Sequence, residues 1–177
     1  MISYMKISAK RLGCTLACCM VVGVLFLASS AMAEPKDSSQ PTQAACTFDD
    51  GKQMYVRYHP DAEKNLPFDK VWAPGGQAML LFTETPLVAG DSDIPIGAYS
   101  LYVIPEKRQW TLVINRDVRH GTGYRESEDV ARVPMEIGEL EQPQQQTRIY
   151  FGHSAAQQCN MRIYHGTVGT WVEFKEK

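Results

Sequence analysis

The amino-acid sequence predicts an all-β fold, an antiparallel β-sandwich of about eight or nine short strands, with a β-barrel as the alternative. Three observations support this prediction. Segments rich in β-branched and aromatic residues alternate with turns that contain Gly, Pro or Asp. Most apolar runs have the length of a strand rather than that of a helix. No window shows a helical stripe that lasts more than a turn or two.

The clearest element is a predicted hairpin of strands 97–104 and 110–115, joined by the polar connection 105–109. β-branched and aromatic residues dominate both arms, as is typical of strands. Because both faces of the hairpin carry apolar groups, we expect it inside a two-layer structure rather than at a solvated edge.

The other strands follow from shorter runs, and the expected ones are 46–48, 53–58, 78–83, 133–137, 147–151, 159–164 and 168–174, with 87–89 as a further short candidate. The turn signal Asp49-Asp50-Gly51 separates the first two. Pro134 cannot donate a hydrogen bond to a neighbouring strand, which predicts an edge position for the segment around it. The polar, glycine-containing segment 116–129 is expected to form a long loop.

Residues 1–33 are interpreted as a secretory signal peptide that is cleaved after Ala33. A basic segment ending at Arg11 precedes an apolar run over 12–28, and the small residues 29–33 form an A-x-A-like cleavage site. The alternative is a membrane anchor, since an apolar run of about 17 residues lies at the lower limit for spanning a bilayer.

Residues 34–45 are rich in Pro, Ser and Gln and lack apolar periodicity, which predicts a disordered leader before a single domain at 46–177. After cleavage the chain has 15 basic and 20 acidic residues, a formal net charge of −5. This acidic balance argues against nucleic-acid and anionic-membrane partners. We therefore expect a periplasmic or secreted protein without stable membrane insertion after cleavage.

Cys46 and Cys159 are the two cysteines that follow the signal peptide, and we predict that they form a disulfide. Two buried free thiols or a metal site are the alternatives. The two cysteines have no C-x-x-C spacing, and this disfavours a metal site.

No catalytic, cofactor or metal site is predicted from motifs. After residue 33 the chain has no G-x-S-x-G or S-x-x-K sequence. If strands 147–151 and 159–164 form a hairpin, His153 and His165 lie roughly 20 Å apart, too far to share an ion. His59 and His120 fall in loops whose mutual position is open.

The segment 69–77 places Trp72 beside a Pro-Gly-Gly turn and carries two hypotheses. In the first, Lys70, Trp72 and Gln77 form a small ligand patch in which Trp72 is partly exposed. In the second, Trp72 is buried and fixes the turn to the core.

The segment 70–75 and the hairpin also contain spaced motifs, which are Lys70-Val71-Trp72 with Gly75, Ile94-Pro95-x-Gly97-x-Tyr99-x-Leu101-x-x-Ile104-Pro105, and Trp110-Thr111-Leu112-x-Ile114-Asn115. In these residues the chain resembles the bacterial family of exported proteins catalogued as domain of unknown function 2911. The resemblance covers most of residues 46–174. It implies export and a β domain, and it implies no catalytic residue or cofactor.

Export, the β pattern and the missing catalytic motifs together predict a non-enzymatic module that binds a small molecule, a glycan or a protein. The alternative is an extracytoplasmic hydrolase or lyase whose site combines Arg57, His59, Lys70 and the loop 116–129. An enzyme should show a concave pocket with a strongly shifted pKa, whereas a binding module needs only a suitable surface.

Overall fold

The computed structural model describes residues 40–60, 65–119 and 123–177. The predicted signal peptide and its cleavage site lie outside these residues. The elements are β1 (Thr42–Thr47), β2 (Gln53–Tyr58), η1 (Pro74–Gly76), β3 (Met79–Thr83), β4 (Leu87–Ala89), β5 (Ser92–Ile94), β6 (Gly97–Pro105), β7 (Trp110–Asn115), η2 (Glu126–Glu128), β8 (Asp129–Ala155) and β9 (Gln158–Glu176). In the described ranges, neither 3-10 helix has the length or apolar character of a membrane span.

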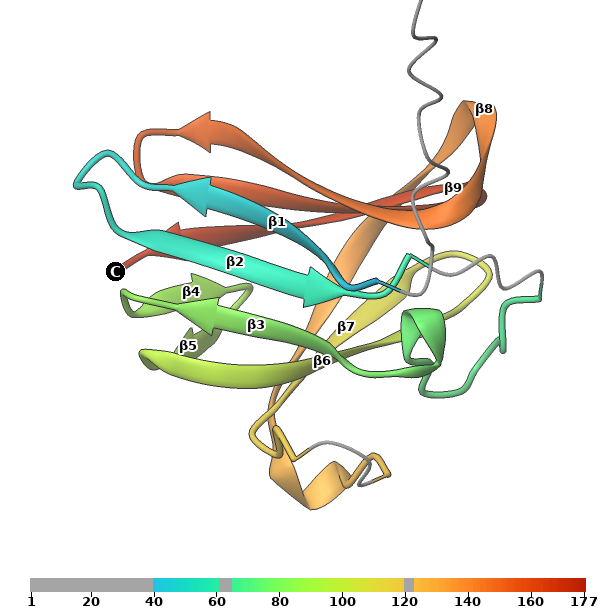
Figure 1. Cartoon of the computed structure of the whole chain (residues 1–177), viewed down its shortest axis with the longest axis horizontal. Helices are drawn as coiled ribbons and strands as arrows, with labels where there is room; N and C mark the ends of the chain where they lie inside the picture. Colours follow the sequence, from blue (N-terminus) through green and yellow to red (C-terminus); the bar gives the residue numbers. More distant parts are fainter. Residues whose placement is uncertain (1–39, 61–64, 120–122) are drawn as a thin grey trace, which may run out of the picture. The chain divides into compact units, whose positions relative to one another are not determined.

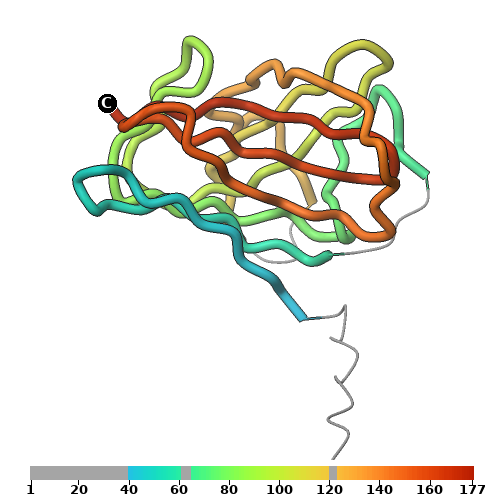
Figure 2. The backbone as a smooth tube through the Cα atoms, turned by 90° about the horizontal axis from the view of Figure 1, so that it is seen from above, coloured from blue at the N-terminus to red at the C-terminus, as the bar shows by residue number. Residues whose placement is uncertain are grey.

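The nine strands form one antiparallel sheet in the order β1-β2-β3-β6-β7-β8-β9-β4-β5. The sheet folds over into two layers (Figures 1 and 2), which confirms the predicted all-β antiparallel architecture. It is not closed into a barrel, because β1 and β5 stand at opposite ends of the strand order described here. The predicted hairpin is β6 and β7, which pair from Ser100↔Asn115 to Pro105↔Trp110 in the middle of the sheet.

β8 carries the chain from one layer to the other. Its first part pairs with β7, ending at Met135, and its next residue, Glu136, begins the pairing with β9. At Pro134, β8 pairs only with β7 among the described strands. The backbone N–H that proline lacks is therefore absent at a position with one neighbouring strand.

β9 reverses direction at Gly166, whose φ of 55° is in the left-handed region that favours glycine. Beyond this residue the strand returns toward its own start, since the N–H of Glu176 donates to the carbonyl of Gln157 at 2.8 Å. The segments 159–164 and 168–174, predicted as separate strands, are therefore the two arms of β9.

β1 begins at Thr42, four residues before the domain boundary predicted at Cys46. Thr42 and Ala44 are half-buried while Gln43 and Ala45 are exposed, which is the alternation of a strand with one covered face. The predicted leader 34–45 is therefore too long at its C-terminal end. Pairing with β2 places these weakly hydrophobic residues in the sheet, with Ala44 opposite Val56.

The core between the layers includes Trp110, Phe48 and Phe174, all nearly inaccessible to solvent. Cys46 of β1 and Cys159 of β9 form the predicted disulfide, with Cα atoms 6.3 Å apart and a sequence separation of 113. The bridge therefore ties the first strand of the domain to the last one.

Candidate functional site

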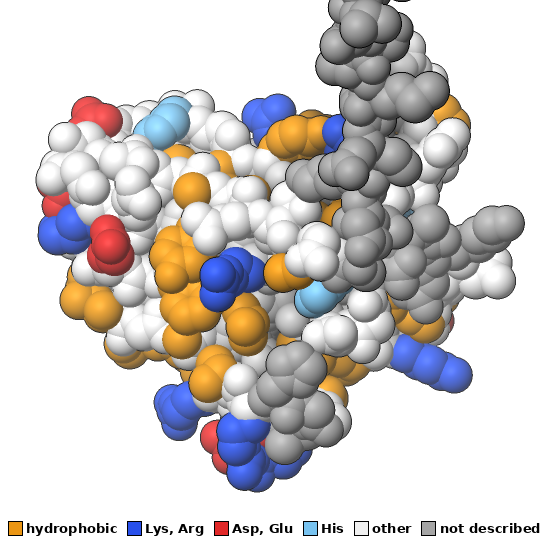
Figure 3. All heavy atoms as spheres, viewed as in Figure 1, with side chains coloured by type: hydrophobic (Ala, Val, Ile, Leu, Met, Phe, Trp, Pro, Cys, Tyr) orange, Lys and Arg blue, Asp and Glu red, His pale blue; other side chains and the backbone are white. Residues whose placement is uncertain are grey.

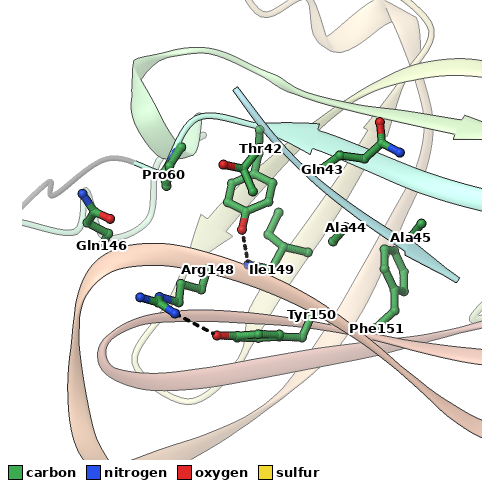
Figure 4. Close-up of a pocket in the computed structure, with 11 residues that line it drawn as sticks. Thr42, Gln43, Ala44, Ala45, Pro60, Gln146, Arg148, Ile149, Tyr150 and Phe151 are labelled. Carbon is green, nitrogen blue, oxygen red and sulfur yellow. Dashed lines mark hydrogen bonds between the residues drawn. The ribbon is translucent and has the colours of Figure 1, made fainter. Parts of the chain in front are cut away.

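A groove of about 530 Å³ lies between β1 and the second half of β8 (Figure 4), within the range of roughly 300–1,000 Å³ common for ligand sites. Its lining residues are Thr42, Gln43, Ala44, Ala45, Tyr58, Pro60, Gln146, Arg148, Ile149, Tyr150 and Phe151.

The groove exists because two strands meet there without pairing. Within the described part of the chain, β1 pairs only with β2, and the segment 148–155 of β8 pairs only with β9. Each strand therefore turns one backbone edge toward the groove. At one end the disulfide closes the space, together with a hydrogen bond from the Asp49 N–H to the Ala156 carbonyl at 3.4 Å.

The floor is apolar and incompletely filled. Ala44 and Phe151 are partly buried and pack against the core, which includes the buried Ile149. Because the inward residues of β1 here are as small as Thr42 and Ala44, they leave a hollow opposite the larger side chains of β8. The hydroxyl oxygen of Thr42 is buried and has no hydrogen-bond partner among the described residues.

Tyr58 provides a polar contact across the floor. Its hydroxyl oxygen accepts a hydrogen bond from the N–H of Ile149 at 3.1 Å (Figure 4). Burial raises the pKa of Tyr58, so the phenol is neutral at physiological pH. One N–H on the groove side of β8 is thus satisfied by a side chain rather than by a neighbouring strand.

Arg148 and Tyr150 stand at the mouth of the groove. The guanidinium Nη1 of Arg148 donates to the Tyr150 hydroxyl at 3.3 Å (Figure 4), and this hydrogen bond raises the pKa of Arg148. Both side chains are exposed, Tyr150 to 42%. The other donors of this guanidinium have no partner among the described residues, and such donors suit the recognition of a carboxylate or another anion.

Trp72, at the centre of the predicted ligand patch, is only 4% exposed. Its ring packs edge-on against Trp110, with ring centroids 6.1 Å apart, and against His165 at 4.9 Å. Its backbone pairs with Val103. Lys70 and Gln77 are exposed, but the ring between them is not, so the structure agrees with the core hypothesis for Trp72.

Two parts of the proposed enzymatic site, Lys70 and the described start of the loop 116–129, lie apart, whereas His59 lies against Gly75 in the same segment as Lys70. The backbone N–H of Asp69, the residue before Lys70, donates to the carbonyl of Pro105 at one end of β6. The loop 116–129 starts beside Ser100 in the same strand, roughly 17 Å from Pro105. Arg57 is exposed on β2, where its partner on β3 is Leu80.

Figure 3 shows hydrophobic side chains around a basic one over β2 and β3. On these two strands the half-buried rings of Tyr55 and Phe82 stack, with their centroids 4.8 Å apart.

The loop after β7 is organised around the buried carboxylate of Asp117. Arg119 Nε donates to it at 2.8 Å and Arg125 Nε at 2.8 Å. These hydrogen bonds, with that from Arg119 as the larger cause, hold the pKa of Asp117 far below its usual range. Nearby, burial and the hydrogen bond to Asp129 raise the pKa of Tyr124 to about 12. Both pKa shifts follow from burial and from hydrogen bonds that hold this loop in place.

A second hollow of about 660 Å³ lies between the β4–β5 turn, β8 and β9, and Trp171 lines it. Several of its polar groups are already bonded within the chain. Trp171 Nε1 donates to Glu136 Oε2 at 3.0 Å, Ser154 Oγ donates to Glu173 at 2.8 Å, and Arg132 pairs with Asp129. The side chains of Trp171, Glu136, Glu173 and Arg132 are therefore engaged within the chain.

His153 lies beside the disulfide, with Nε2 3.6 Å from Cys46 Sγ. The donor atoms of Cys46, His153 and Cys159 fall within 4.8 Å of one another, a spacing compatible with a metal ion. Metal binding needs thiolates, and both sulfur atoms are joined in the disulfide.

Residues 48–174 match the model of the family described as "Protein of unknown function (DUF2911)". The chain belongs to this family. None of the curated proteins and none of the solved structures matches it. Tyr58, Pro60 and the β8 wall of the groove lie inside the residues that match the DUF2911 model, whereas the β1 wall, Thr42–Ala45, precedes them.

Sequence reasoning missed the groove because its two walls are about one hundred residues apart in the chain. Neither wall has a motif. The available signal was weak: two small inward residues, Thr42 and Ala44, precede Cys46 in a segment that composition assigned to the leader.

Proposed function

We propose that this DUF2911 member is an exported binding domain whose ligand occupies the groove between β1 and β8. The observation that carries the proposal is the groove itself, where a hollow apolar floor, a buried hydroxyl and a cation at the mouth lie together. The predicted signal peptide supports export, and the disulfide fits an oxidising compartment.

The lining chemistry favours binding over covalent chemistry. The described lining residues contribute alkyl and aromatic groups, amides, hydroxyls and one guanidinium, and none of them contributes a carboxylate, imidazole, thiol or amine. Groups of this kind bury apolar surface and orient polar atoms. Tyr58, the buried lining residue with a raised pKa, is held neutral and already bonded to Ile149.

The ligand class follows from the same groups. Ala44, Ile149 and Phe151 match an apolar portion, and the Thr42 hydroxyl can donate to or accept from a polar atom. Arg148 can form a charge-assisted hydrogen bond with a negative group. The ligand is therefore an amphipathic molecule with an apolar body and a carboxylate or similar anion.

Backbone amide NMR shifts of the mature protein test this proposal with three probes: N-acetyl-leucine, its neutral amide and glucose. N-acetyl-leucine should shift the amides of Ala44 and Ile149, the neutral amide should bind about tenfold more weakly, and glucose should leave both unchanged.

Two variants control for the charge. Arg148→Ala should reduce the affinity for N-acetyl-leucine to that of the amide, while Arg108→Ala, an exposed arginine in the β6–β7 connection, should not. Shifts confined to another part of the domain, or equal binding of glucose, would refute the proposed site or the proposed ligand class.

A further inference from the structure

We infer that the outer face of β8 and β9, beside the groove, binds an acidic oligosaccharide, a chain of uronic acids in which each sugar carries a carboxylate. Four outward side chains, Arg148, Tyr150, Arg162 and Tyr164, carry the inference and are called the outer-face cluster. The inference goes beyond the proposed function, because Arg162 and Tyr164 lie outside the lining of the groove. The two sites share Arg148 and Tyr150 at the mouth of the groove.

The register of β8 and β9 places the four side chains of the outer-face cluster together. Arg148 pairs with Tyr164, and Tyr150 pairs with Arg162. These side chains are exposed or half-buried, whereas those at the positions between them, such as Ile149, are buried and face the core. The cluster is therefore a square on one face of the sheet, with the arginines on one diagonal and the tyrosines on the other. In Figure 2 the orange and red arms of β8 and β9 lie toward the viewer, on the outside of this layer.

The outer-face cluster is a local positive site on an acidic domain. Neither Arg148 nor Arg162 forms an ion pair with a carboxylate of the described residues. Arg162 Nε donates to Asn160 Oδ1 at 2.9 Å, and Arg148 Nη1 donates to the Tyr150 hydroxyl at 3.3 Å. Each guanidinium therefore keeps further N–H groups for a ligand, and charge complementarity favours an anion.

Two exposed carboxylates of the same two strands, Glu136 and Glu173, bond elsewhere. Trp171 Nε1 donates to Glu136 at 3.0 Å, and Ser154 Oγ donates to Glu173 at 2.8 Å. Within the described structure neither carboxylate forms an ion pair with an arginine of the outer-face cluster. The two guanidiniums are thus available to a negative ligand.

The spacing of the two arginines indicates how the negative charges of the ligand are distributed. Diagonal positions of an antiparallel pair lie about 7–8 Å apart. Duplex DNA carries one charge for about every 1.7 Å of its axis, which is much denser. An acidic sugar chain has one carboxylate for each ring, and this matches two separated cations more closely. The acidic net charge of the mature chain also disfavours a densely charged polyanion.

The two tyrosines favour sugar rings over an acidic peptide. Tyr150 is 42% exposed and Tyr164 is half-buried, and their rings lie with centroids 5.3 Å apart and planes tilted by 48°. The C–H groups of a pyranose ring can pack against these rings while its hydroxyls bond to the phenol oxygens. Gly169 leaves the space that Tyr164 occupies, since a Cβ atom there would lie 3.4 Å from two atoms of the ring.

The basic and aromatic surface over β2 and β3 provides a contrast (Figure 3). There the rings of Tyr55 and Phe82 stack with planes only 16° apart, so each ring covers one face of the other. Arg57 is exposed on the same strand as Tyr55. This surface has the same residue types with less ring area open to a sugar, and it therefore supplies matched control residues.

Calorimetric titration of the mature protein with trimers of galacturonate, guluronate and mannuronate tests the inference. The tightest trimer is compared with its methyl ester, which keeps the rings without the charges, and with triglutamate, which keeps the charges without the rings. Both should bind at least about tenfold more weakly than the trimer. Equal binding of the ester would remove the role of the arginines, and equal binding of triglutamate would make the surface a site for acidic peptides. Either result overturns the inference, as does the failure of all three trimers to bind.

Two substitutions outside the groove locate the binding surface. Arg162→Ala and Tyr164→Leu should each weaken the tightest trimer by at least about fivefold, because one removes a charge-assisted hydrogen bond and the other an aromatic ring. Leucine keeps an apolar side chain against Gly169, and circular dichroism checks that both variants are folded. The matched variants on β2, Arg57→Ala and Tyr55→Leu, should bind like the wild type. A loss of affinity in the β2 variants alone would place the sugar on the other surface and contradict the inference.

N-acetyl-leucine separates this inference from the proposed function. It should bind Arg162→Ala and Tyr164→Leu with wild-type affinity, because neither residue lines the groove. If N-acetyl-leucine binds and no trimer does, the inference fails and the proposed function stands. If a trimer binds as expected and N-acetyl-leucine does not, the proposed function fails alone. A trimer that loses affinity in Arg148→Ala but not in Arg162→Ala or Tyr164→Leu would be a ligand of the groove, and the inference would be wrong.

Discussion

At the scale of single residues, Trp72 is a structural anchor of the segment before β3. Its ring contacts Trp110 and His165, and its backbone joins Val103 of β6. Gly75 in the adjoining turn has a φ of 79° and packs against the backbone of His59, which leaves no space for a side chain. The motif Lys70-Val71-Trp72 with Gly75 is thus explained by packing.

Replacement of Trp72 by alanine should therefore lower the free energy of unfolding by about 3–5 kcal/mol, because a large buried ring is lost. Denaturant unfolding followed by fluorescence or circular dichroism measures this change. Phe68→Ala is the matched control, since that aromatic side chain in the same segment is 49% exposed and its loss should cost about 0.5 kcal/mol or less. Equal losses for the two variants would contradict the assignment.

Asp117 predicts a specific dependence of stability on pH. Arg119 and Arg125 lower the pKa of its carboxyl in the folded protein, so the charged form stabilises the fold above the unfolded pKa of about 3.9. This contribution is lost as the pH falls below that value toward the folded pKa.

The melting temperatures of the wild type and Asp117→Asn should therefore differ at pH 7 and converge as the pH approaches 2. Asp91→Asn, which changes an exposed carboxylate in the β4–β5 turn, is the control and should not show the same convergence. A difference that is independent of pH would mean that the ion pairs do not stabilise the fold.

At the scale of elements, the two edge strands of the groove depend on the disulfide that joins β1 to β9. The bridge closes a loop with a sequence separation of 113 residues, and the chain-entropy model gives about 4–5 kcal/mol for a loop of that size. Strain in the folded state would reduce this value.

The variant with both Cys46→Ala and Cys159→Ala should accordingly be less stable by about 2–5 kcal/mol. Hydrogen exchange of β1 amides should increase more than that of β6, because β1 pairs with one strand and β6 with two. An unchanged unfolding free energy would show that β1 is held by its pairing with β2 alone.

Elements with strong local patterns were predictable and weakly patterned ones were not. The β6–β7 hairpin follows from its dense β-branched and aromatic residues, and the central place of the hairpin follows from apolar groups on both faces. The start of β1 was missed because Thr42–Ala45 carry little hydrophobicity and become ordered through pairing with β2. The change of β8 from one layer to the other and the reversal of β9 at Gly166 depend on tertiary contacts, which cannot be predicted from any short segment of the sequence.

The candidate site was not predictable for a related reason. The disulfide could be inferred from two cysteines in a chain that is predicted to be exported. The groove depends on two edges that approach without pairing, a property of the folded sheet rather than of any residue type. Arg148 and Tyr58 line the groove only because these two strand edges lie close together in the folded sheet.

At the scale of the whole molecule, the proposed location rests on residues 1–33, which the structure does not describe. Their order of basic, apolar and small residues predicts cleavage after Ala33. Intact-mass analysis of the exported protein should give an N-terminus at Glu34. A full-length product recovered from the membrane fraction would instead support the anchor.

The central claim is that ligands bind in the groove between β1 and β8, and a groove-filling variant tests it most directly. Ala44→Leu adds three carbons to the floor opposite Ile149, and Ala155→Leu makes the same change at an exposed position of β8 outside the lining. Calorimetric titration with N-acetyl-leucine compares the two folded variants with the wild type. We predict that Ala44→Leu weakens the binding of N-acetyl-leucine by at least about tenfold while Ala155→Leu binds it like the wild type. Wild-type affinity in Ala44→Leu would contradict the assignment of the site.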